Sequence, residues 1–155
     1  MDNVSIEFEI VNPALVSTND AYYHPVRKTK SGRYMSYVCK SESLKKLQEF
    51  YKDKLSELIT DKDIDSISSV LSSDKSYGLS LTLCVGVPNS ELFEHDISNY
   101  IKSLEDCIVK RIKIDDSRNL EVHAIKCVSD EWKLSVKIHP LLKYNYDEII
   151  NYQED

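Results

Sequence analysis

The most apolar stretch of the chain, Tyr77 to Val87, carries a large aliphatic side chain on every second residue. The alternating positions are Leu79, Leu81, Leu83, Val85 and Val87. A period of two is the pattern of a β-strand that buries one face. Pro88 and Asn89 follow at once, and both are typical of the end of a strand. The chain is therefore expected to fold around a β-sheet that contains this strand.

Three other segments also have the pattern of strands. Val4 to Val11 alternates isoleucine and phenylalanine with serine and glutamate, and Pro13 ends this segment. Asn119–Val128 and Trp132–His139 are predicted as two further strands joined by a turn at 129–131. The stretch from Ala14 to Arg33 is predicted as an irregular loop or a short hairpin.

Two amphipathic helices are predicted from apolar residues spaced three and four apart. The first has Ser41 or Ser43 as its cap and an apolar stripe of Leu44, Leu47, Tyr51, Leu55 and Leu58. The second begins near Asp96 or Ser98, runs to about Arg111, and has an apolar stripe of Ile97, Ile101, Leu104 and Ile108. Its opposite side aligns Asn99, Lys102 and Asp106.

These elements predict a protein of the α/β (α+β) class: a small mixed sheet with two main helices packed on it. The length of 155 residues predicts one domain, residues 1–155. The polar segment 61–75 is predicted as an inserted loop or a weak short helix. The tail, 144–155, is acidic and aromatic, and it is a candidate short helix.

The net charge of −6 argues against a nucleic-acid partner, but its distribution argues for one. The window from Ala21 to Lys46 holds seven lysines and arginines and a single acid, Glu42. This window carries +6, which leaves −12 for the rest of the chain. Two interpretations follow: a local phosphate-binding segment on an acidic body, or a solvated basic loop.

Several protein classes do not fit the sequence. No apolar run approaches the roughly 20 residues that a membrane helix needs, and Met1 is not followed by a signal-peptide pattern. The four cysteines form no C-x-x-C pair, and their spacing suits no zinc site. A cytoplasmic protein without a membrane partner is therefore expected.

One acid-rich block has the residue types that phosphodiester cleavage needs. It reads Asp96-Ile97-Ser98-Asn99-Tyr100-Ile101-Lys102, and Asp106 and the pair Asp115-Asp116 follow it. Cleavage needs an activated water and neutralisation of the phosphate charge, and magnesium held by carboxylates supplies both. A nearby lysine stabilises the transition state. The alternative interpretation is a solvated acidic helix face.

The order and spacing of this block resemble the signature of the RusA family of Holliday-junction resolvases. Two further segments resemble the family: Ser17-Thr18-Asn19 with Tyr22-Tyr23-His24 and the basic loop ending in Gly32-Arg33, and Lys126 on the strand after Asp116. The resemblance runs from about Val4 to Ile138. It fails in 61–75 and in the tail, which look like additions.

The resemblance implies a homodimeric endodeoxyribonuclease that depends on Mg²⁺, or on Mn²⁺, and nicks four-way DNA junctions symmetrically. By position, Asp96 and Asp116 match catalytic aspartates that bind the metal, with Asp115 as a further metal ligand, and Lys102 matches the catalytic lysine. Ser98, Asn99 and Asp106 are supporting residues. Candidate DNA contacts are Asn19, Tyr22, Tyr23, His24, Arg27, Lys28, Lys30, Arg33 and Lys126. For Tyr22 and Tyr23, stacking on unpaired bases and core packing are both open.

One position departs from the family pattern. The family has D-x-D-N, and here Ser98 stands at the second aspartate. Asp115 or Asp106 could replace the missing carboxylate, or Ser98 could hold a metal-bound water. Alternatively, the protein is weak or inactive as an enzyme and binds branched DNA or a protein partner. An unrelated small α/β protein with a coincidental likeness is the third hypothesis. Because phages often encode RusA-type proteins, a bacterial or phage-infected cell is the expected setting.

Overall fold

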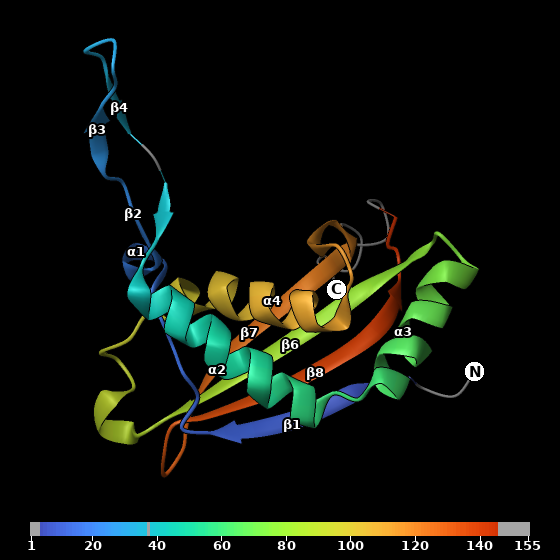
Figure 1. Cartoon of the computed structure of the whole chain (residues 1–155). Coiled ribbons are helices and arrows are strands. Elements are labelled where there is room, and N and C mark those ends of the chain that lie inside the picture. Colours follow the sequence, from blue (N-terminus) through green and yellow to red (C-terminus); the bar gives the residue numbers. More distant parts are fainter. Residues whose placement is uncertain (1–3, 37, 146–155) are drawn as a thin grey trace.

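The computed structural model describes residues 4–36 and 38–145, and its core is a four-stranded mixed sheet (Figure 1). The strand order is β1 (Ile6–Val11), β8 (Lys133–Leu142), β6 (Tyr77–Val87) and β7 (Asn119–Val128). β8 runs antiparallel to both β1 and β6, whereas β7 runs parallel to β6. The predicted bounds of β6 and β7 are confirmed, and β8 continues three residues further than predicted.

Helices cover one face of this sheet (Figure 1). They are the short α1 (Thr18–Ala21) and three longer helices: α2 (Glu42–Leu58), α3 (Asp61–Ser73) and α4 (Ser98–Ile112). The alternating aliphatic side chains of β6 are all buried, and they form the core with Leu134, Val136 and Ile138 of β8. The predicted α/β class with a mixed sheet is confirmed, although there are three long helices and not two.

Both predicted amphipathic helices are present. Ser41 caps α2, because its Oγ accepts a hydrogen bond from the Leu44 N–H at 3.1 Å. At the start of α4 the N-cap position is Ile97, whose side chain makes no capping bond. The carboxylate of Asp96 accepts the Ser98 N–H at 3.1 Å, so one of the two predicted caps serves this helix start. Lys113 ends α4 in a left-handed conformation, with φ of 58°.

Of the two interpretations of 61–75, the inserted loop is wrong and the helix is correct, because this segment forms the regular helix α3. Its stability comes from a capping box: Thr60 Oγ1 accepts the Asp63 N–H at 3.2 Å, and Asp63 Oδ2 accepts the Thr60 N–H at 2.8 Å. Its three buried side chains, Ile64, Ile67 and Leu71, join the core, and the helix packs against β6 and β8. Good caps offset the low apolar content of this segment.

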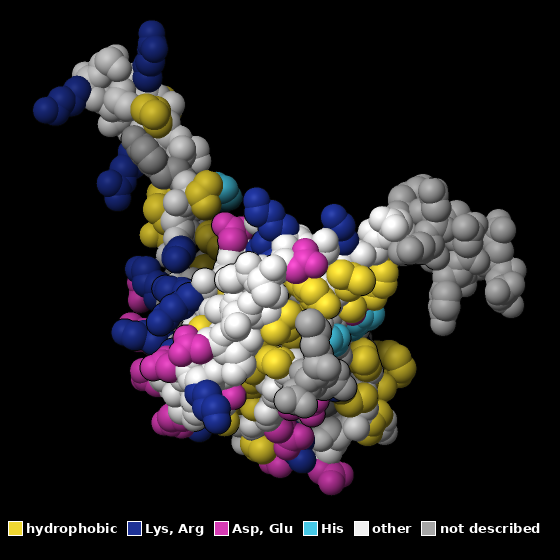
Figure 2. Space-filling view, turned by 90° about the vertical axis from the view of Figure 1, so that its right-hand side faces the viewer, with side chains coloured by type: hydrophobic (Ala, Val, Ile, Leu, Met, Phe, Trp, Pro, Cys, Tyr) yellow, Lys and Arg dark blue, Asp and Glu magenta, His cyan; other side chains and the backbone are white. Residues whose placement is uncertain are grey.

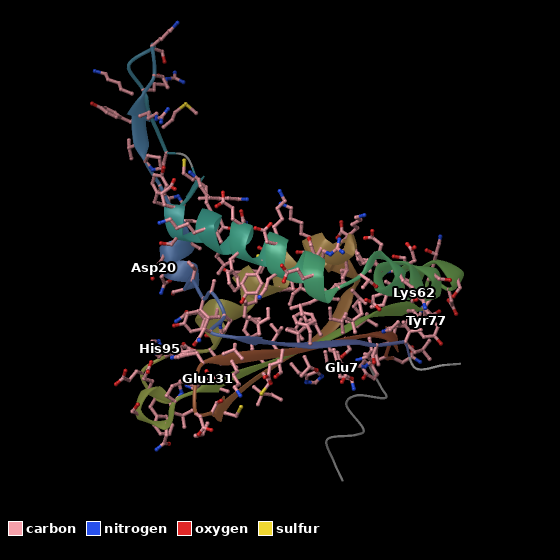
Figure 3. The ribbon with its side chains drawn as sticks, turned by 60° about the horizontal axis from the view of Figure 1, so that its bottom comes forward. Glu7, Asp20, Lys62, Tyr77, His95 and Glu131 are labelled. Atoms are coloured by element: carbon pink, nitrogen blue, oxygen red, sulfur yellow. The ribbon has the colours of Figure 1, made fainter. Side chains whose placement is uncertain are left out.

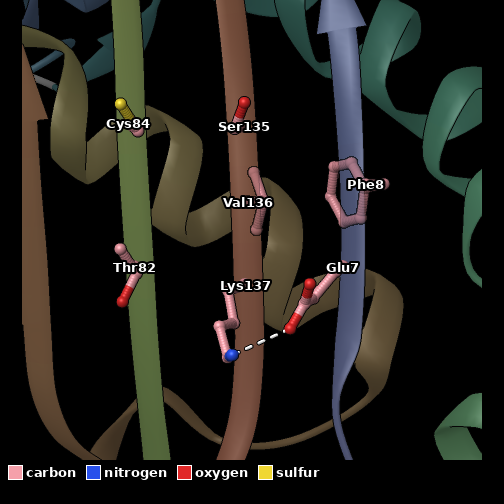
Figure 4. Close-up of a pocket in the computed structure, with 7 residues that line it drawn as sticks. All are labelled: Glu7, Phe8, Thr82, Cys84, Ser135, Val136 and Lys137. Atoms are coloured by element: carbon pink, nitrogen blue, oxygen red, sulfur yellow. Dashed lines mark ion pairs between the residues drawn. The ribbon is translucent and has the colours of Figure 1, made fainter. Parts of the chain in front are cut away.

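The face of the sheet opposite the helices carries mainly polar side chains. A shallow depression of about 380 Å³ on it is crossed by an ion pair between Glu7 Oε1 and Lys137 Nζ, at 2.8 Å (Figure 4). Thr82 and Ser135 also line this depression. A sheet with one solvated face is usual where its strands pair antiparallel. None of the lining residues belongs to the predicted site.

A basic arm, residues 22–36 and 38–40, projects from the body of the molecule (Figure 1). Its outer part is a hairpin of β3 (Val26–Lys28) and β4 (Tyr34–Ser36), and its base pairs β2 (Tyr22–Tyr23) with β5 (Cys39–Lys40). Gly32 has a φ of 80° in the turn at the tip. The hairpin alternative for this region is therefore confirmed. Residues 146–155 of the predicted tail helix lie outside the described residues.

Within the described ranges, no helix is both long enough and apolar enough to cross a membrane.

The arginine near the end of α4 connects this helix to the end of α2. Arg111 Nε donates to the Leu55 carbonyl at 3.3 Å, and its Nη2 donates to the Ile59 carbonyl. The Ile59 carbonyl follows the last residue of α2, and the Leu55 carbonyl also accepts the Ile59 N–H at 2.9 Å. Arg111 therefore satisfies the C-terminal end of α2 and fixes the two helices against each other.

Replacing Arg111 is expected to destabilise the fold. Arg111→Met keeps most of the aliphatic volume but leaves two carbonyls without their charged donor, so we expect a loss of about 2 kcal/mol in the free energy of unfolding. Urea titration followed by circular dichroism measures this as a lower midpoint with an unchanged slope. The neighbouring exposed variant Lys110→Met is the control. Equal midpoints for the two variants would contradict this role.

Candidate active site

The residues around Lys102 form the candidate active site. Lys102 Nζ lies 2.8 Å from Asp106 Oδ1, 3.0 Å from Asp116 Oδ2 and 3.6 Å from Glu105 Oε2. Asp106 and Glu105 follow Lys102 by four and three residues, so the helix itself brings them to the same face. Asp116 belongs to the short 3₁₀ turn Asp116–Arg118, which follows the reversal of the chain at Lys113.

Three carboxylates surround the ammonium of Lys102 and favour its charged form. Its hydrogen bonds to Asp106 and then to Asp116 raise the pKa of Lys102 well above its ordinary value. The side chain is still 53% exposed, so it remains accessible to an anion from solvent. Lys102 is therefore a permanent positive charge at neutral pH and not a proton acceptor.

Glu105 connects this cluster to the start of β7. Its Oε1 accepts a hydrogen bond from Asn119 Nδ2 at 2.6 Å, while its Oε2 faces Lys102. The Glu105 side chain is only 15% exposed, which holds the carboxylate in place. Sequence reasoning missed Glu105, although its position three residues after Lys102 was the signal that could have found it.

Asp96 and Ser98 form a local pair at the start of α4. Oδ1 of Asp96 accepts both the N–H of Ser98 and the hydroxyl of Ser98, the latter at 2.8 Å. Both residues are exposed. The Ser98 hydroxyl thus holds the Asp96 carboxylate in one orientation, which is a supporting role that a second aspartate would not fill in the same way.

Asp115 and Asp116 are adjacent but make different contacts. Asp115 caps the 3₁₀ turn, because its Oδ1 accepts the N–H of Ser117 at 2.9 Å. These hydrogen bonds with Ser117 lower the pKa of Asp115. Asp116 instead contacts Lys102. Of the predicted site residues, the structure therefore brings together Lys102, Asp106 and Asp116.

The loop before α4 is fixed by a second group of side chains. His95 Nδ1 lies 3.0 Å from the Tyr100 hydroxyl, and the His95 ring packs edge-on against Trp132 with centroids 5.0 Å apart. Trp132 Nε1 donates to Glu91 at 3.1 Å. Lys126 Nζ donates to the His95 carbonyl at 2.7 Å, so this predicted DNA contact also anchors the loop that carries Asp96.

Asp20 of α1 is a further acid at this end of the sheet. Burial raises the pKa of the Tyr100 hydroxyl, and the charges of Asp20 and then Asp96 raise it further. Asp20 therefore lies within electrostatic range of the same phenol as Asp96, and Figure 3 shows Asp20 and His95 at the same end of the molecule. No pattern in the sequence indicated Asp20, because α1 reaches α4 only through tertiary packing.

The other candidate DNA contacts lie on α1 and the basic arm, and all are exposed. Tyr22 and Tyr23 are 39% and 52% exposed, so neither packs in the core. Lys28 Nζ lies 5.9 Å from the centre of the Tyr34 ring. Figure 2 shows lysine and arginine side chains along the projecting arm. The exposed candidates are Asn19, Tyr22, Tyr23, His24, Arg27, Lys28, Lys30 and Arg33.

The predicted metal ligands, Asp96, Asp115 and Asp116, each contact a different neighbour. Within residues 4–36 and 38–145, no group of three or more His, Cys, Asp or Glu side chains is arranged to hold a metal ion. Asp96 and Asp115 make the local hydrogen bonds described above, and Asp116 pairs with Lys102. Asn99 is half-buried in the first turn of α4.

Comparison of the sequence with known protein-family models and with curated proteins finds no match.

Proposed function

We propose that this protein is a structure-selective endodeoxyribonuclease that depends on Mg²⁺ or Mn²⁺ and resolves four-way DNA junctions. The observation that carries the proposal is the 3.0 Å contact between Lys102 and Asp116, which are 14 residues apart. These two residues are two of the three, with Asp96, that the resemblance to RusA-type resolvases selects as catalytic. Helical spacing alone does not account for this contact, because Asp116 lies beyond the end of α4.

Lys102 has the properties of a group that stabilises charge on a phosphate. It is permanently protonated, oriented by Asp106 and Asp116, and 53% exposed. A phosphate oxygen that reaches this ammonium gains a charge-assisted hydrogen bond as negative charge develops during cleavage. Glu105 and Asp106 act as positioning residues, because they hold Lys102 and do not need to touch the DNA.

The carboxylates also suit a hard divalent cation in their chemistry. Asp96 uses Oδ1 for Ser98, and Asp116 uses Oδ2 for Lys102. Asp96 and Asp116 would hold the ion, with Asp115 in support, although the described residues do not present these three carboxylates as a preformed metal-binding group. When bound, Mg²⁺ would activate a water and neutralise charge on the phosphate.

The basic arm supports DNA as the substrate. Between Tyr22 and Ser36 it carries four lysines and arginines and no acid in the sequence, and its basic side chains are exposed. We assign Arg27, Lys28, Lys30 and Arg33 to the phosphate backbone and the exposed Tyr22 and Tyr23 to unpaired bases at the junction centre. Symmetric nicking needs two sites related by a two-fold axis, which a homodimer supplies.

Incubation with a labelled four-way junction tests this function. A linear duplex of the same sequence is the substrate control, and Mg²⁺, Mn²⁺ and chelator are the three conditions. Nicks in the junction alone, lost with chelator, are expected. A junction that is left intact with either metal contradicts the nuclease.

The second candidate function is binding without catalysis, to branched DNA or to a protein partner. This candidate is favoured by Ser98, which has a neutral hydroxyl where the family has a carboxylate. The hydroxyl donates a hydrogen bond to Asp96 at 2.8 Å. This candidate expects a junction that is retarded in a gel yet stays uncut in every metal. The same assay therefore separates the two functions.

Restoring the second carboxylate tests the role of position 98. Ser98→Asp adds an oxygen ligand and a negative charge next to Asp96. The cleavage rate is therefore expected to stay unchanged or rise, and the Mg²⁺ concentration for half-maximal cleavage is expected to fall about three- to tenfold. The uncharged variant Ser98→Asn is the control, and Mg²⁺ titration of the cleavage rate is the measurement. A large fall in Ser98→Asp, with the fold intact, would show that the hydroxyl bond to Asp96 is itself required.

A further inference from the structure

The helices α2 and α4 pack side by side (Figure 1). A groove of about 500 Å³ runs along the surface between them. Its walls are strongly charged. Two acids line it, Glu49 and Asp106. Five cations line it as well: Lys45, Lys52, Lys110, Arg111 and Lys113. A groove with this excess of positive charge suits an anionic partner.

Charged side chains form a row on α4. Lys102, Asp106 and Lys110 are spaced four residues apart, so they lie along one side of the helix, and Lys113 follows at its C-cap. The row begins in the candidate active site, because Asp106 both lines the groove and pairs with Lys102. The groove is therefore continuous with the cluster around Lys102.

The positive charge of the groove is only partly neutralised within the chain. Lys45 pairs with Glu42 at 2.7 Å, and Arg111 is bound to carbonyls of α2. Lys52, Lys110 and Lys113 are exposed, and none forms an ion pair with a residue in the described parts of the chain. These three lysines are available to a partner.

The base of the basic arm joins the groove near the start of α2, at the end that also holds the start of α4 (Figure 1). Lys40 Nζ donates to Gln48 Oε1 at 3.3 Å, and Gln48 lines the groove. Cys107 also lines the groove. Burial and then the charge of Asp106 raise the pKa of its thiol to about 11, whereas the charges of Lys110 and Lys40 lower it. Both lysines thus lie within electrostatic range of the same thiol, which places the arm and α4 around one surface.

We infer that the α2–α4 groove binds the sugar-phosphate backbone of one duplex branch of the DNA, leading away from the phosphate at Lys102. From Lys102 to Lys110, α4 rises about 12 Å, which corresponds to about three to four nucleotides of a DNA strand. Flexible lysines on both walls of the groove suit a polyanion with regularly spaced charges. This inference deepens the proposed function and rests on it.

Neutralising the three available lysines tests the inference. In the variant Lys52→Gln/Lys110→Gln/Lys113→Gln, the Kd for a four-way junction is expected to rise about tenfold to a hundredfold in moderate salt. The slope of log K against log salt should decrease by about 2 to 3, since each phosphate contact contributes about 0.9. Binding is measured with chelator present, so that cleavage does not interfere.

Two matched variants control the experiment. Lys62→Gln/Lys75→Gln/Lys143→Gln removes the same charge from exposed lysines outside the groove, and its Kd should change by less than about threefold. Lys52→Arg/Lys110→Arg/Lys113→Arg keeps the charge and should keep the affinity. Circular dichroism of all variants confirms that the fold is retained.

The possible outcomes separate the inference from the proposed function. If the parent protein binds the junction and the groove variant binds equally well, the groove assignment fails and the nuclease proposal stands. If the parent protein does not bind the junction at low salt, the proposed function fails and the inference fails with it. If the parent binds an oligoglutamate peptide through these lysines and does not bind DNA, the groove is a protein-docking surface and the inference is overturned.

Discussion

Asp116→Asn is expected to abolish cleavage of a four-way junction, with a loss of at least about a hundredfold in rate. Asparagine has nearly the same shape and still offers an oxygen to Lys102, but it lacks the negative charge that binds a divalent cation and pairs with the ammonium at 3.0 Å. Single-turnover cleavage with Mg²⁺ measures the effect. Binding of the junction should remain within about threefold, since Asp116 repels phosphate and does not attract it.

The control for this variant is an aspartate elsewhere on the surface. Asp65→Asn removes one exposed carboxylate from α3 and should leave both cleavage and binding unchanged. Thermal unfolding of both variants excludes a general loss of structure. Cleavage by Asp116→Asn at the parental rate would contradict the assignment of this residue, whatever the result for the control.

Lys102→Gln is expected to reduce the cleavage rate by about a hundredfold to a thousandfold at saturating DNA. The variant removes the positive charge that faces the phosphate and leaves the carboxylates of Glu105, Asp106 and Asp116 close together without a cation. Lys102→Arg keeps the charge and should recover part of the rate. A parental rate in Lys102→Gln would show that the cluster is structural.

The raised pKa of Lys102 gives this prediction a pH dependence. The carboxylates favour the charged form, so deprotonation occurs only above the ordinary lysine range. The part of the rate that depends on Lys102 should therefore be constant between about pH 7 and pH 10, where an ordinary lysine begins to lose its proton. A fall in the ratio of parental to Lys102→Gln rates within this range would contradict the ion cluster.

Lys102 and Asp116 should also act as one unit. The double variant Lys102→Gln/Asp116→Asn is expected to lose little more activity than the worse single variant, because each single change already breaks their contact. Effects that simply multiply would indicate that the two residues act independently. A double-mutant cycle on the cleavage rate distinguishes these cases.

Local patterns were sufficient for most of the secondary structure. The alternation in β6 and the stripe in α2 have strong periodicity and clear ends, namely Pro88 and the Ser41 cap. For 61–75 the sequence left a loop and a weak helix open, because few apolar residues follow the capping box at Thr60 and Asp63. The capping box and three buried side chains decide the structure in favour of the helix.

Long-range placement could not be derived from local patterns. β7 and β8 are consecutive in the chain, yet each pairs with β6 and not with the other. The same limit applies to the site. Helical spacing predicted that Lys102 and Asp106 share a face, but the approach of Asp116 and Asp20 to α4 depends on how the chain returns after Lys113 and how α1 packs.

Mapping of cuts on all four strands of a junction tests the central claim most directly. Each strand is labelled separately and incubated with the parental protein in Mg²⁺, with the parental protein in chelator, and with Asp116→Asn in Mg²⁺. The account predicts nicks at symmetric positions on two opposed strands in the first reaction alone. Four uncut strands in the first reaction, or equal cutting in all three, would contradict it.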